Sequence, residues 1–310
     1  MDRLDAMRAF VRVVERRSFI AAAQDLALPR SRVSEAVKQL ERRLGVRLLV
    51  RTTRQVKPTV EGEDYYRRVL AILYAIDDAD AAVSDDVPNG PLRIDVHGTF
   101  ARRYLLPALP EFLDKHPGIR LHIGESDRLV DLVGEGVDCV IRIGDPADSG
   151  LVGRKLGTVA EGTFASPDYL ARHGTPASPD ELKGHRMIGF VSTATRAVIP
   201  LEFGTGASTR MVTLPTAATV SAASTNAYLA RLGLGLIQVP RYRVAQELAT
   251  GALVEVLADW LPAPSPVYML YLEGRQRSPR VRLFIDWATA VVSAELDRNG
   301  HDGATGHVPA

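Results

Sequence analysis

The sequence predicts a multidomain protein with a small N-terminal helical unit, a long connecting helix and a larger α/β region. Two short helical patterns flank a tight turn between Ser18 and Leu44, and strand and helix patterns alternate after Pro91. Charge divides the chain in the same way. There are 16 Lys and Arg against 9 Asp and Glu through Arg68, and 22 against 28 beyond it. A basic head on an acidic body indicates a polyanion as the partner of the head alone.

Length and composition are typical of a soluble globular protein of about two domains, with 310 residues, 46% of them hydrophobic and 24% charged. The single cysteine, Cys139, lies in an apolar run, so we expect a small buried side chain with no disulfide or metal role. The N-terminus is charged and amphipathic from its start, unlike a signal peptide. No apolar run reaches the ~18 residues that a membrane span needs. We therefore expect a cytoplasmic protein with no membrane partner.

Three helices are expected in the N-terminal unit. The first has Asp2 as a possible cap. Ser18 is a candidate cap for the second, a small-residue helix that should stop by Leu28 because the following Pro29 disfavours helical backbone before it. The first helix has an apolar stripe that should pack behind the other two. The stripe consists of Leu4, Met7, Phe10, Val11 and Val14.

The third helix combines an apolar face with a polar one. Val33, Val37, Leu40 and Leu44 recur at spacings of four, three and four, and Gly45 follows where a helix C-cap glycine belongs. This is helix-turn-helix spacing, in which the start of the second helix of the motif meets base edges in the major groove. The alternative is an ordinary solvated charged face. The residues that we expect to contact DNA are Arg30, Ser31, Arg32, Ser34, Glu35 and Lys38.

A β-hairpin should follow Gly45. Residues 46–51 alternate as a strand, a turn follows, and residues 55–59 can return. Such a basic hairpin suits phosphates or the minor groove, as the wing of a winged helix-turn-helix does. The alternative is an ordinary basic hairpin. The residues that we expect to contact DNA from this hairpin are Arg51, Thr52, Thr53 and Arg54.

Residues 1–62 resemble the winged helix-turn-helix of LysR-type transcriptional regulators. The shared features are the Ser-aromatic-x-Ala-Ala-Ala start at 18–23, Val33-Ser34, Leu40-Glu41, the run LGVRLLVRTTR at 44–54 and the Thr-x-x-Gly at 59–62. The resemblance continues to about Arg298.

Two departures from the family pattern bear on base reading. Pro29 stands where the family usually has Ser or Thr, so the usual hydroxyl cap is missing, and Ser31 is a possible substitute in a helix that starts later. Glu35 stands where the family often has a basic or amide residue. A carboxylate there repels phosphate, although it can accept from cytosine N4.

The connecting helix should begin at Thr59 as its cap. Its apolar residues recur in a heptad-like seam broken by Asp80. We favour a dimer seam over packing on its own domain, and the resemblance implies the linker helix through which the family dimerises. Two recognition helices could then read two half-sites in a homodimer or homotetramer. The seam consists of Tyr66, Val69, Leu73, Ile76 and Val83.

The α/β region starts after a Pro- and Gly-rich boundary at 87–91. Strand, helix, strand, helix and strand patterns run to residue 144, with helices expected over 104–116 and 129–136, and this rhythm predicts a mostly parallel sheet. A second set begins near Glu161, and a final strand and long helix end the pattern. The resemblance implies a two-lobed effector-binding domain, like periplasmic binding proteins, whose last strand and helix return to the first lobe.

We therefore expect a multidomain fold: an all-α winged helix-turn-helix domain over 1–59, a linker or dimerisation helix over 60–87, and a two-lobed α/β effector-binding domain over 88–298. Lobe 1 should hold about 91–160 with 268–298, and lobe 2 about 161–267. The remainder, 299–310, is rich in Gly and His and should form a flexible tail.

Ligands bind beyond the carboxyl ends of strands in open α/β sheets. Thr99 is the strongest single candidate, since the family's effector contacts cluster there. Arg142 could pair with a ligand carboxylate or form an internal ion pair with a neighbour such as Asp145. Taken singly, each candidate could be a turn or cap residue, but together they should converge on one cleft. The candidate effector-binding residues are Gly98, Thr99, Phe100, Ser126, Arg142, Gly144, Phe190, Ser192, Thr193 and Asn226.

The sequence contains no G-x-S-x-G, P-loop or H-E-x-x-H motif. The run GLGLIQ from Gly233 lacks the third glycine of a dinucleotide fingerprint and precedes a strand, so it should end a helix. We expect no catalytic residues, no metal and no cofactor. The sequence predicts a sequence-specific DNA-binding transcriptional regulator. The resemblance implies that a small molecule in the cleft, such as an organic acid, modulates its DNA binding and its contact with RNA polymerase. The alternatives are an α/β enzyme with an accessory basic domain and a non-specific nucleoid-type DNA binder.

Overall fold

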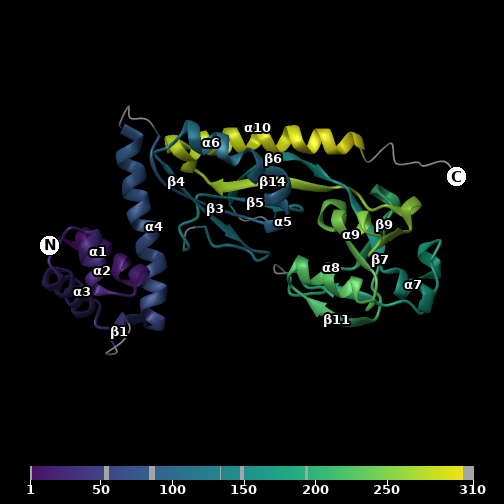
Figure 1. Ribbon diagram of the computed structural model, residues 1–310, viewed down its shortest axis with the longest axis horizontal. Coiled ribbons are helices and arrows are strands. Elements are labelled where there is room, and N and C mark those ends of the chain that lie inside the picture. The colour runs from purple at the N-terminus through teal and green to yellow at the C-terminus, as the bar shows by residue number, and fades with distance from the viewer. Residues whose placement is uncertain are drawn as a thin grey trace. The chain divides into compact units, whose positions relative to one another are not determined.

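The computed structural model describes residues 2–51, 56–83, 88–132, 134–146, 150–192 and 195–302. The chain divides into two compact units (Figure 1). The first contains Met1–Pro88, Val130–Asp138 and Arg277–Pro279. The second contains Asn89–Leu129, Cys139–Gln276 and Arg280–Ala310.

The first unit holds the predicted three helices and a hairpin. They are α1 (Arg3–Arg16), α2 (Phe19–Asp25), α3 (Arg30–Leu44), β1 (Leu49–Arg51), β2 (Val56–Pro58) and the long helix α4 (Val60–Val83). The predicted caps are confirmed, since the Asp2 carboxylate accepts from the N–H of Asp5 at 2.7 Å and the Ser18 hydroxyl accepts from Ala21 at 3.3 Å. Gly45 ends α3 with a left-handed φ of 71°, as the sequence predicts.

The core of this unit joins α1, α2, α3 and α4. Phe10, Val33 and Val37 are fully buried in it. From α4, Val69 is also fully buried and Leu73 nearly so, hence these two seam residues pack on their own domain and their assignment to a dimer seam is wrong. The helix needs them there because a single α1–α3 layer leaves one side of Phe10 uncovered.

The second unit is built on two groups of strands, which we call lobe 1 and lobe 2. Lobe 1 has a five-stranded sheet in the order β4-β3-β5-β14-β6. Its strands are β3 (Gly90–Val96), β4 (Ile119–Glu125), β5 (Cys139–Ile143), β6 (Leu151–Val159) and β14 (Ser265–Leu272). β3 runs parallel to β4 and β5, but β14 runs antiparallel to β5 and β6.

The predicted mostly parallel sheet is therefore corrected to a mixed one. β6 leads out of lobe 1 and β14 leads back into it, so the two strands lie side by side in opposite directions. As expected, Cys139 is fully buried in the lobe 1 core. The final strand and helix belong to lobe 1, as the resemblance implied.

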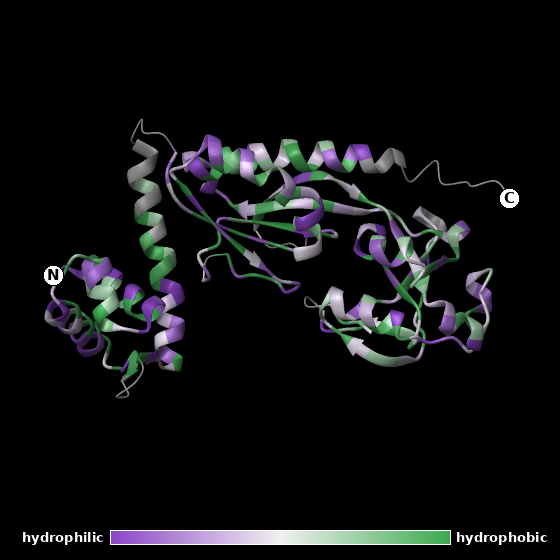
Figure 2. Ribbon diagram, in the orientation of Figure 1, coloured by the Kyte–Doolittle hydropathy of each residue, from purple (hydrophilic) through white to green (hydrophobic). Residues whose placement is uncertain are grey.

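The helices of lobe 1 are α5 (Gly98–Phe100), α6 (Leu109–Lys115) and α10 (Pro279–Asp302). A π-helical turn and a 3₁₀ turn link α5 to α6, so the helix expected over 104–116 starts earlier and changes type at Pro107 and Pro110. Hydrophobic residues recur along α10 (Figure 2), and Val281, Phe284 and Ala288 are buried against the sheet. α10 continues to Asp302, so residues 299–302 of the predicted tail are helical.

The helix predicted over 129–136 is wrong, since the described residues of that segment form turns. The Asp131 carboxylate accepts from the N–H of Gly134 at 2.9 Å, and Gly136 has a left-handed φ of 64°. A short polar side chain that binds nearby backbone competes with helix formation, and the left-handed glycine then stops propagation.

Lobe 2 contains smaller sheets. In the first, β7 (Glu161–Ala165) lies between β12 (Ile237–Pro240) and β13 (Val254–Val256) and is antiparallel to both. In the second, β8 (Met187–Phe190) runs parallel to β11 (Thr216–Val220). In the third, β9 (Leu201–Phe203) pairs antiparallel with β10 (Arg210–Val212). The helices are α7 (Pro167–His173), α8 (Ala223–Arg231) and α9 (Ala245–Ala249). Gly233 follows α8 with a left-handed φ of 73°, which confirms that GLGLIQ begins at a helix end.

Within the described part of the chain, the longest helices are too polar to cross a lipid bilayer.

Candidate functional site

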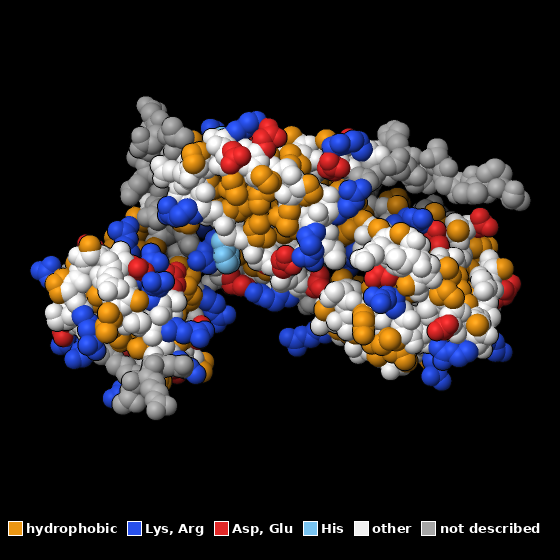
Figure 3. All heavy atoms as spheres, in the orientation of Figure 1, with side chains coloured by type: hydrophobic (Ala, Val, Ile, Leu, Met, Phe, Trp, Pro, Cys, Tyr) orange, Lys and Arg blue, Asp and Glu red, His pale blue; other side chains and the backbone are white. Residues whose placement is uncertain are grey.

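The polar face of α3 is the first candidate site. Val33, Ala36 and Val37 turn into the core, so the other side of the helix must face outward. Many Lys and Arg side chains lie on the visible face of this unit (Figure 3). The structure leaves five of the six predicted contact residues of α3 exposed and Ser34 half-buried. The exposed ones are Arg30, Ser31, Arg32, Glu35 and Lys38.

The start of α3 differs from one expectation. The helix begins at Arg30 with Pro29 as its N-cap, and Pro29 supplies no side-chain hydrogen bond there. Ser31 already lies in the first helical turn, so it is not the cap and the proposed later start is wrong. Proline is well suited to this place because its fixed φ, here −60°, leads directly into the helix. The N-terminal end of a helix is in general a favourable place for phosphate.

Glu35 forms an ion pair with Arg42, which lies on the same helix, α3. Arg42 also donates to the carbonyl of Lys38 at 3.4 Å. The carboxylate that the sequence analysis regarded as repelling phosphate is therefore compensated by a neighbouring guanidinium.

Glu41 fixes the hairpin to α3. Its carboxylate accepts from the N–H groups of Leu48 at 2.9 Å and Leu49 at 3.1 Å, at the start of β1. Sequence reasoning assigned no role to this residue beyond the family pattern. The signal was present as a glutamate five residues before the strand predicted over 46–51.

The Thr-x-x-Gly motif joins the hairpin to α4. The Thr59 hydroxyl donates to the carbonyl of Arg47 at 2.8 Å and accepts from the N–H of Gly62 at 2.9 Å, which confirms Thr59 as a cap. A Cβ on Gly62 would lie 2.0 Å from the carbonyl oxygen of Leu48, so only glycine fits. Arg51 ends β1, whereas Thr52, Thr53 and Arg54 lie outside the described residues.

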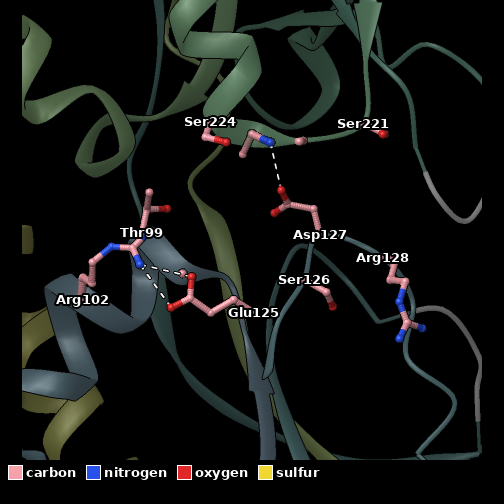
Figure 4. A pocket seen from close by; sticks show the side chains of 11 residues that line it. Thr99, Arg102, Glu125, Ser126, Asp127, Arg128, Ser221 and Ser224 are labelled. Carbon is pink, nitrogen blue, oxygen red and sulfur yellow. Dashed lines mark hydrogen bonds and ion pairs between the residues drawn. The ribbon is translucent and has the colours of Figure 1, made fainter. Parts of the chain in front are cut away.

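The second candidate site is a cleft of about 430 Å³ in the second unit, between the strand ends of lobe 1 and the start of α8 in lobe 2. Of the predicted effector-binding residues, Gly98, Thr99 and Ser126 line it. Figure 4 shows Thr99 beside Arg102 and Glu125, with Ser221 and Ser224 across the space. The lining residues that the site prediction did not include are Arg102, Glu125, Asp127, Arg128, Ser221, Ala222, Ala223 and Ser224.

Asp127 bridges the two lobes at this cleft. Its carboxylate lies 2.6 Å from Nδ1 of His97 in lobe 1 and accepts from the N–H of Ala223, at the start of α8, at 2.9 Å (Figure 4). The hydrogen bond with His97, opposed by partial burial and helped by Ala223, lowers the pKa of Asp127 from 3.8 to about 2. Burial lowers the pKa of His97, so at neutral pH a neutral imidazole donates to a carboxylate.

Arg102, in the π-helical turn after α5, and Glu125, at the end of β4, form an ion pair. Nη1 of Arg102 lies 3.1 Å from both carboxylate oxygens. A Cβ on Gly98 would lie 2.0 Å from Glu125 Oε2, so the glycine lets this carboxylate approach the backbone of α5. The cleft therefore contains guanidinium and carboxylate groups that are already matched with each other.

Six other predicted effector residues are placed elsewhere. Phe100 is fully buried in the lobe 1 core, against Tyr104 and Tyr242. Arg142 pairs with Asp95 at 2.5 Å, with side chains only 13% and 10% exposed. The internal ion pair considered for Arg142 therefore exists, with Asp95 instead of Asp145.

The other four predicted effector residues that the structure describes, Gly144, Phe190, Ser192 and Asn226, take part in backbone turns and strands or are buried. The N–H of Gly144 donates to the carbonyl of Pro266 in a turn, and the N–H of Ser192 donates to Ala197 after Phe190 ends β8. Asn226 is 1% exposed on the inner side of α8. None of these residues lines the cleft, and Thr193 lies outside the described residues.

The described residues contain no cluster of three or more His, Cys, Asp and Glu side chains that could hold a metal ion.

Family models match both parts of the chain. The model of the bacterial regulatory helix-turn-helix protein, lysR family, matches residues 4–63, and that of the LysR substrate binding domain matches residues 85–293. The chain belongs to the LysR family. It is therefore a DNA-binding transcriptional regulator with an all-α helix-turn-helix domain and an α/β domain, and it is not an enzyme, as the sequence predicted.

Similar proteins extend over almost the whole LysR-type chain. The HTH-type transcriptional regulator YhjC of Escherichia coli (strain K12) is 39% identical over 301 residues, covering 96% of this chain and 100% of that protein. The solved structure of CrgA, a LysR-type transcriptional regulator from Neisseria meningitidis, has a TM-score of 0.56 at 33% identity and covers 92% of this chain and 97% of that one. The full-length structure of AphB, a virulence activator of Vibrio cholerae, has a TM-score of 0.60 at 27% identity, with 94% and 100% covered.

Proposed function

We propose that this LysR-type chain reads specific operator sequences with the start of α3 and holds the duplex with the hairpin. Arg32 and the other exposed side chains of α3 face base edges, and Lys38 faces a phosphate. The hairpin residues Arg51, Thr52, Thr53 and Arg54 contact the backbone or the minor groove. The support is the outward polar face of α3 on a helix that its own core holds in place.

Two copies of the chain bind an operator with imperfect dyad symmetry, as a homodimer or a pair of dimers. A C2 arrangement brings two α3 helices to half-sites about one turn of DNA apart. The exposed residue Ile72 of α4 supports this pairing, because it leaves an apolar side chain for a second subunit beside the buried Val69 and Leu73. The protein acts in the cytoplasm and changes the contact of RNA polymerase with the promoter.

A small organic acid is the effector, and it binds the cleft. Hydroxyl groups of Thr99, Ser221 and Ser224 surround a space large enough for a small molecule, with Arg102 beside it. The effector carboxylate takes the place of Glu125 on Arg102. The ligand regulates DNA binding through its different affinities for two arrangements of the lobes.

Selection of sheared DNA from the source genome on the purified protein tests the regulator proposal. We expect strong enrichment of a few intergenic sites with a dyad, and the neighbouring genes then indicate the chemical class of the effector. Uniform retention that is lost at moderate salt would contradict sequence-specific reading.

Thermal-shift measurements with acetate, succinate and benzoate test the cleft. We expect at least one acid to raise the melting temperature of the wild type and to lose this effect in Arg102→Gln. Ser192→Ala, outside the cleft, is the matched control. A stabilisation that Arg102→Gln leaves unchanged would exclude the cleft as the binding site for that acid.

A further inference from the structure

Two chain segments connect the lobes, and one half-buried carboxyl, that of Glu161, joins them. The first passes from β6 through Ala160 to Glu161 at the start of β7, and the second enters β14 at Ser265. Ser265 is paired with Val159 in the sheet, so the two crossover segments lie side by side. The Glu161 side chain hydrogen-bonds with Ser265, which ties one crossover to the other.

The segment 241–244, a 3₁₀ turn after β12, packs over this point. The N–H of Arg241 donates to the carbonyl of Ala160 at 2.9 Å. Arg243 donates to the Tyr242 hydroxyl at 3.2 Å, and Tyr242 hydrogen-bonds in turn with Thr99 in the cleft. A continuous chain of polar contacts therefore runs from the effector cleft to the crossovers.

Charged groups reach Glu161 from several elements. Arg243 from the 3₁₀ turn favours its ionised form, and Glu202 from β9 opposes it. On the neighbouring strand β13, Glu255 is already paired with Arg241, and the half-buried Tyr242 lies near Glu161. Arg243 and Glu202 thus act on the charge of Glu161 in opposite directions, while Arg241 is paired with Glu255.

Burial outweighs these partners and raises the pKa of Glu161 from 4.5 to about 7. Its ionised form is costly in this enclosed place because the low dielectric disfavours charge. Opening of the crossovers to water removes that cost. The acid form should therefore favour the enclosed arrangement, and the ionised form an arrangement in which the carboxylate is hydrated.

We propose that Glu161 is a proton-operated hinge, which sets the arrangement of the two lobes through its bond to Ser265 and communicates with the cleft through Arg243, Tyr242 and Thr99. The proton is then a second effector, which binds at a different place from the ligand that fills the cleft. Occupation of the cleft at Thr99 and protonation of Glu161 are linked, so each alters the affinity for the other.

Distance measurements between spin labels on the full-length protein test this hinge. Lys115→Cys in lobe 1 and Met211→Cys in lobe 2 offer exposed attachment points, whereas the natural Cys139 is fully buried and stays unlabelled. Dilution with unlabelled protein removes distances between subunits. We expect the distance distribution to change between pH 4.5 and 8.5 without any added ligand, with a midpoint between the ordinary glutamate pKa of 4.5 and the raised value of about 7.

Three variants identify the titrating group. Glu161→Gln mimics the protonated form and should keep the low-pH distribution throughout. Glu202→Gln is the matched control, and it should retain the transition with a lower midpoint because a negative neighbour is removed. Ser265→Ala should raise the midpoint, since its hydrogen bond favours the ionised carboxylate.

A wild-type distribution that is identical at pH 4.5 and 8.5 would overturn the proposal, as would a Glu161→Gln variant that titrates like the wild type. If Glu161→Gln fails to fold by circular dichroism, opposite midpoint shifts in Glu202→Gln and Ser265→Ala support the hinge. Unshifted midpoints in both variants contradict it. The DNA selection described above is independent of these outcomes, so the hinge and the regulator proposal can fail separately.

Discussion

The polar face of α3 and the cleft beside α8 use charge in opposite ways. On α3, Arg30, Arg32 and Lys38 extend into solvent from a helix that the core holds in place. In the cleft, Asp127 is bound by His97 and Ala223, and Arg102 is bound by Glu125. An exposed cation meets a phosphate at little desolvation cost, whereas a charge that already has a partner must exchange it. The first surface can bind quickly and tightly, and the second can switch between two sets of partners.

Removal of one exposed guanidinium should have the largest effect. Arg32→Ala should weaken binding to the preferred operator by about 1–3 kcal/mol, roughly 5- to 150-fold in Kd, if Arg32 pairs with guanine. Base preference at that position should relax as well. Fluorescence anisotropy with the operator and with single-base variants measures both quantities. Unchanged affinity for the operator would remove Arg32 from the base-reading set.

Asp127→Asn tests the paired charges of the cleft. The folded-state pKa of Asp127 is lowered to about 2, so the ionised carboxylate stabilises the fold above pH 3.8, and this stabilisation is lost as the pH falls toward 2. After an allowance for partial exposure, wild type should exceed the variant by about 1–2 kcal/mol in free energy of unfolding at pH 7.

Urea unfolding followed by tryptophan fluorescence measures this difference, because Trp260 and Trp287 both lie in the second unit. The gap between wild type and variant should close between about pH 4 and pH 2. A gap that is constant with pH would mean that packing, not the charge of Asp127, is responsible.

Lys38→Ala should act on all DNA sequences alike. Loss of one phosphate contact reduces the slope of log K against log salt by about 1 and leaves base preference unchanged. A salt titration on operator and random duplexes gives both slopes. A loss confined to the operator would assign Lys38 to a base.

Glu35→Gln should have the smallest effect, since its ion pair with Arg42 lies at the surface. The side chains are about half and two-thirds exposed, so the stability of the helical unit should change by less than about 0.5 kcal/mol. The released Arg42 should bind random DNA slightly more tightly. A large loss of stability would show that this pair supports α3 and would weaken the contrast with the cleft.

Local chemistry made the helical unit predictable. Asp2, Ser18 and Gly45 cap or end helices within three residues of themselves, and the spacing of Val33 and Val37 fixes the buried side of α3. The failures there also have local causes. Pro29 can start a helix without a hydroxyl, so the search for a replacement cap at Ser31 was unnecessary.

The cleft was harder to predict because it depends on contacts between distant segments. Thr99 and Ser126 follow predicted strands, and ligands bind beyond the carboxyl ends of strands in such sheets, so both could be predicted from the sequence. Asp127 and Ala223 are 96 residues apart, and their contact exists only because the start of α8 lies against the segment that follows β4. For Arg142, the residue type was compatible with either a ligand or an internal partner, and the approach of Asp95 in the parallel strand β3 decided between them.

The close approach of Gly62 to the carbonyl of Leu48 has a practical consequence for hybrid regulators. Thr59 and Gly62 belong to α4, or to its cap, yet their bonds and contacts are with the segment that leads into β1. The hairpin and the first turn of α4 thus form one rigid unit. A rotation of α4 should therefore move the hairpin with it. A graft that exchanges the N-terminal part for that of a relative should therefore be spliced beyond Gly62. A junction at residue 59 would combine Thr59 and Gly62 from one protein with Arg47 and Leu48 from another, so these close contacts would no longer be matched.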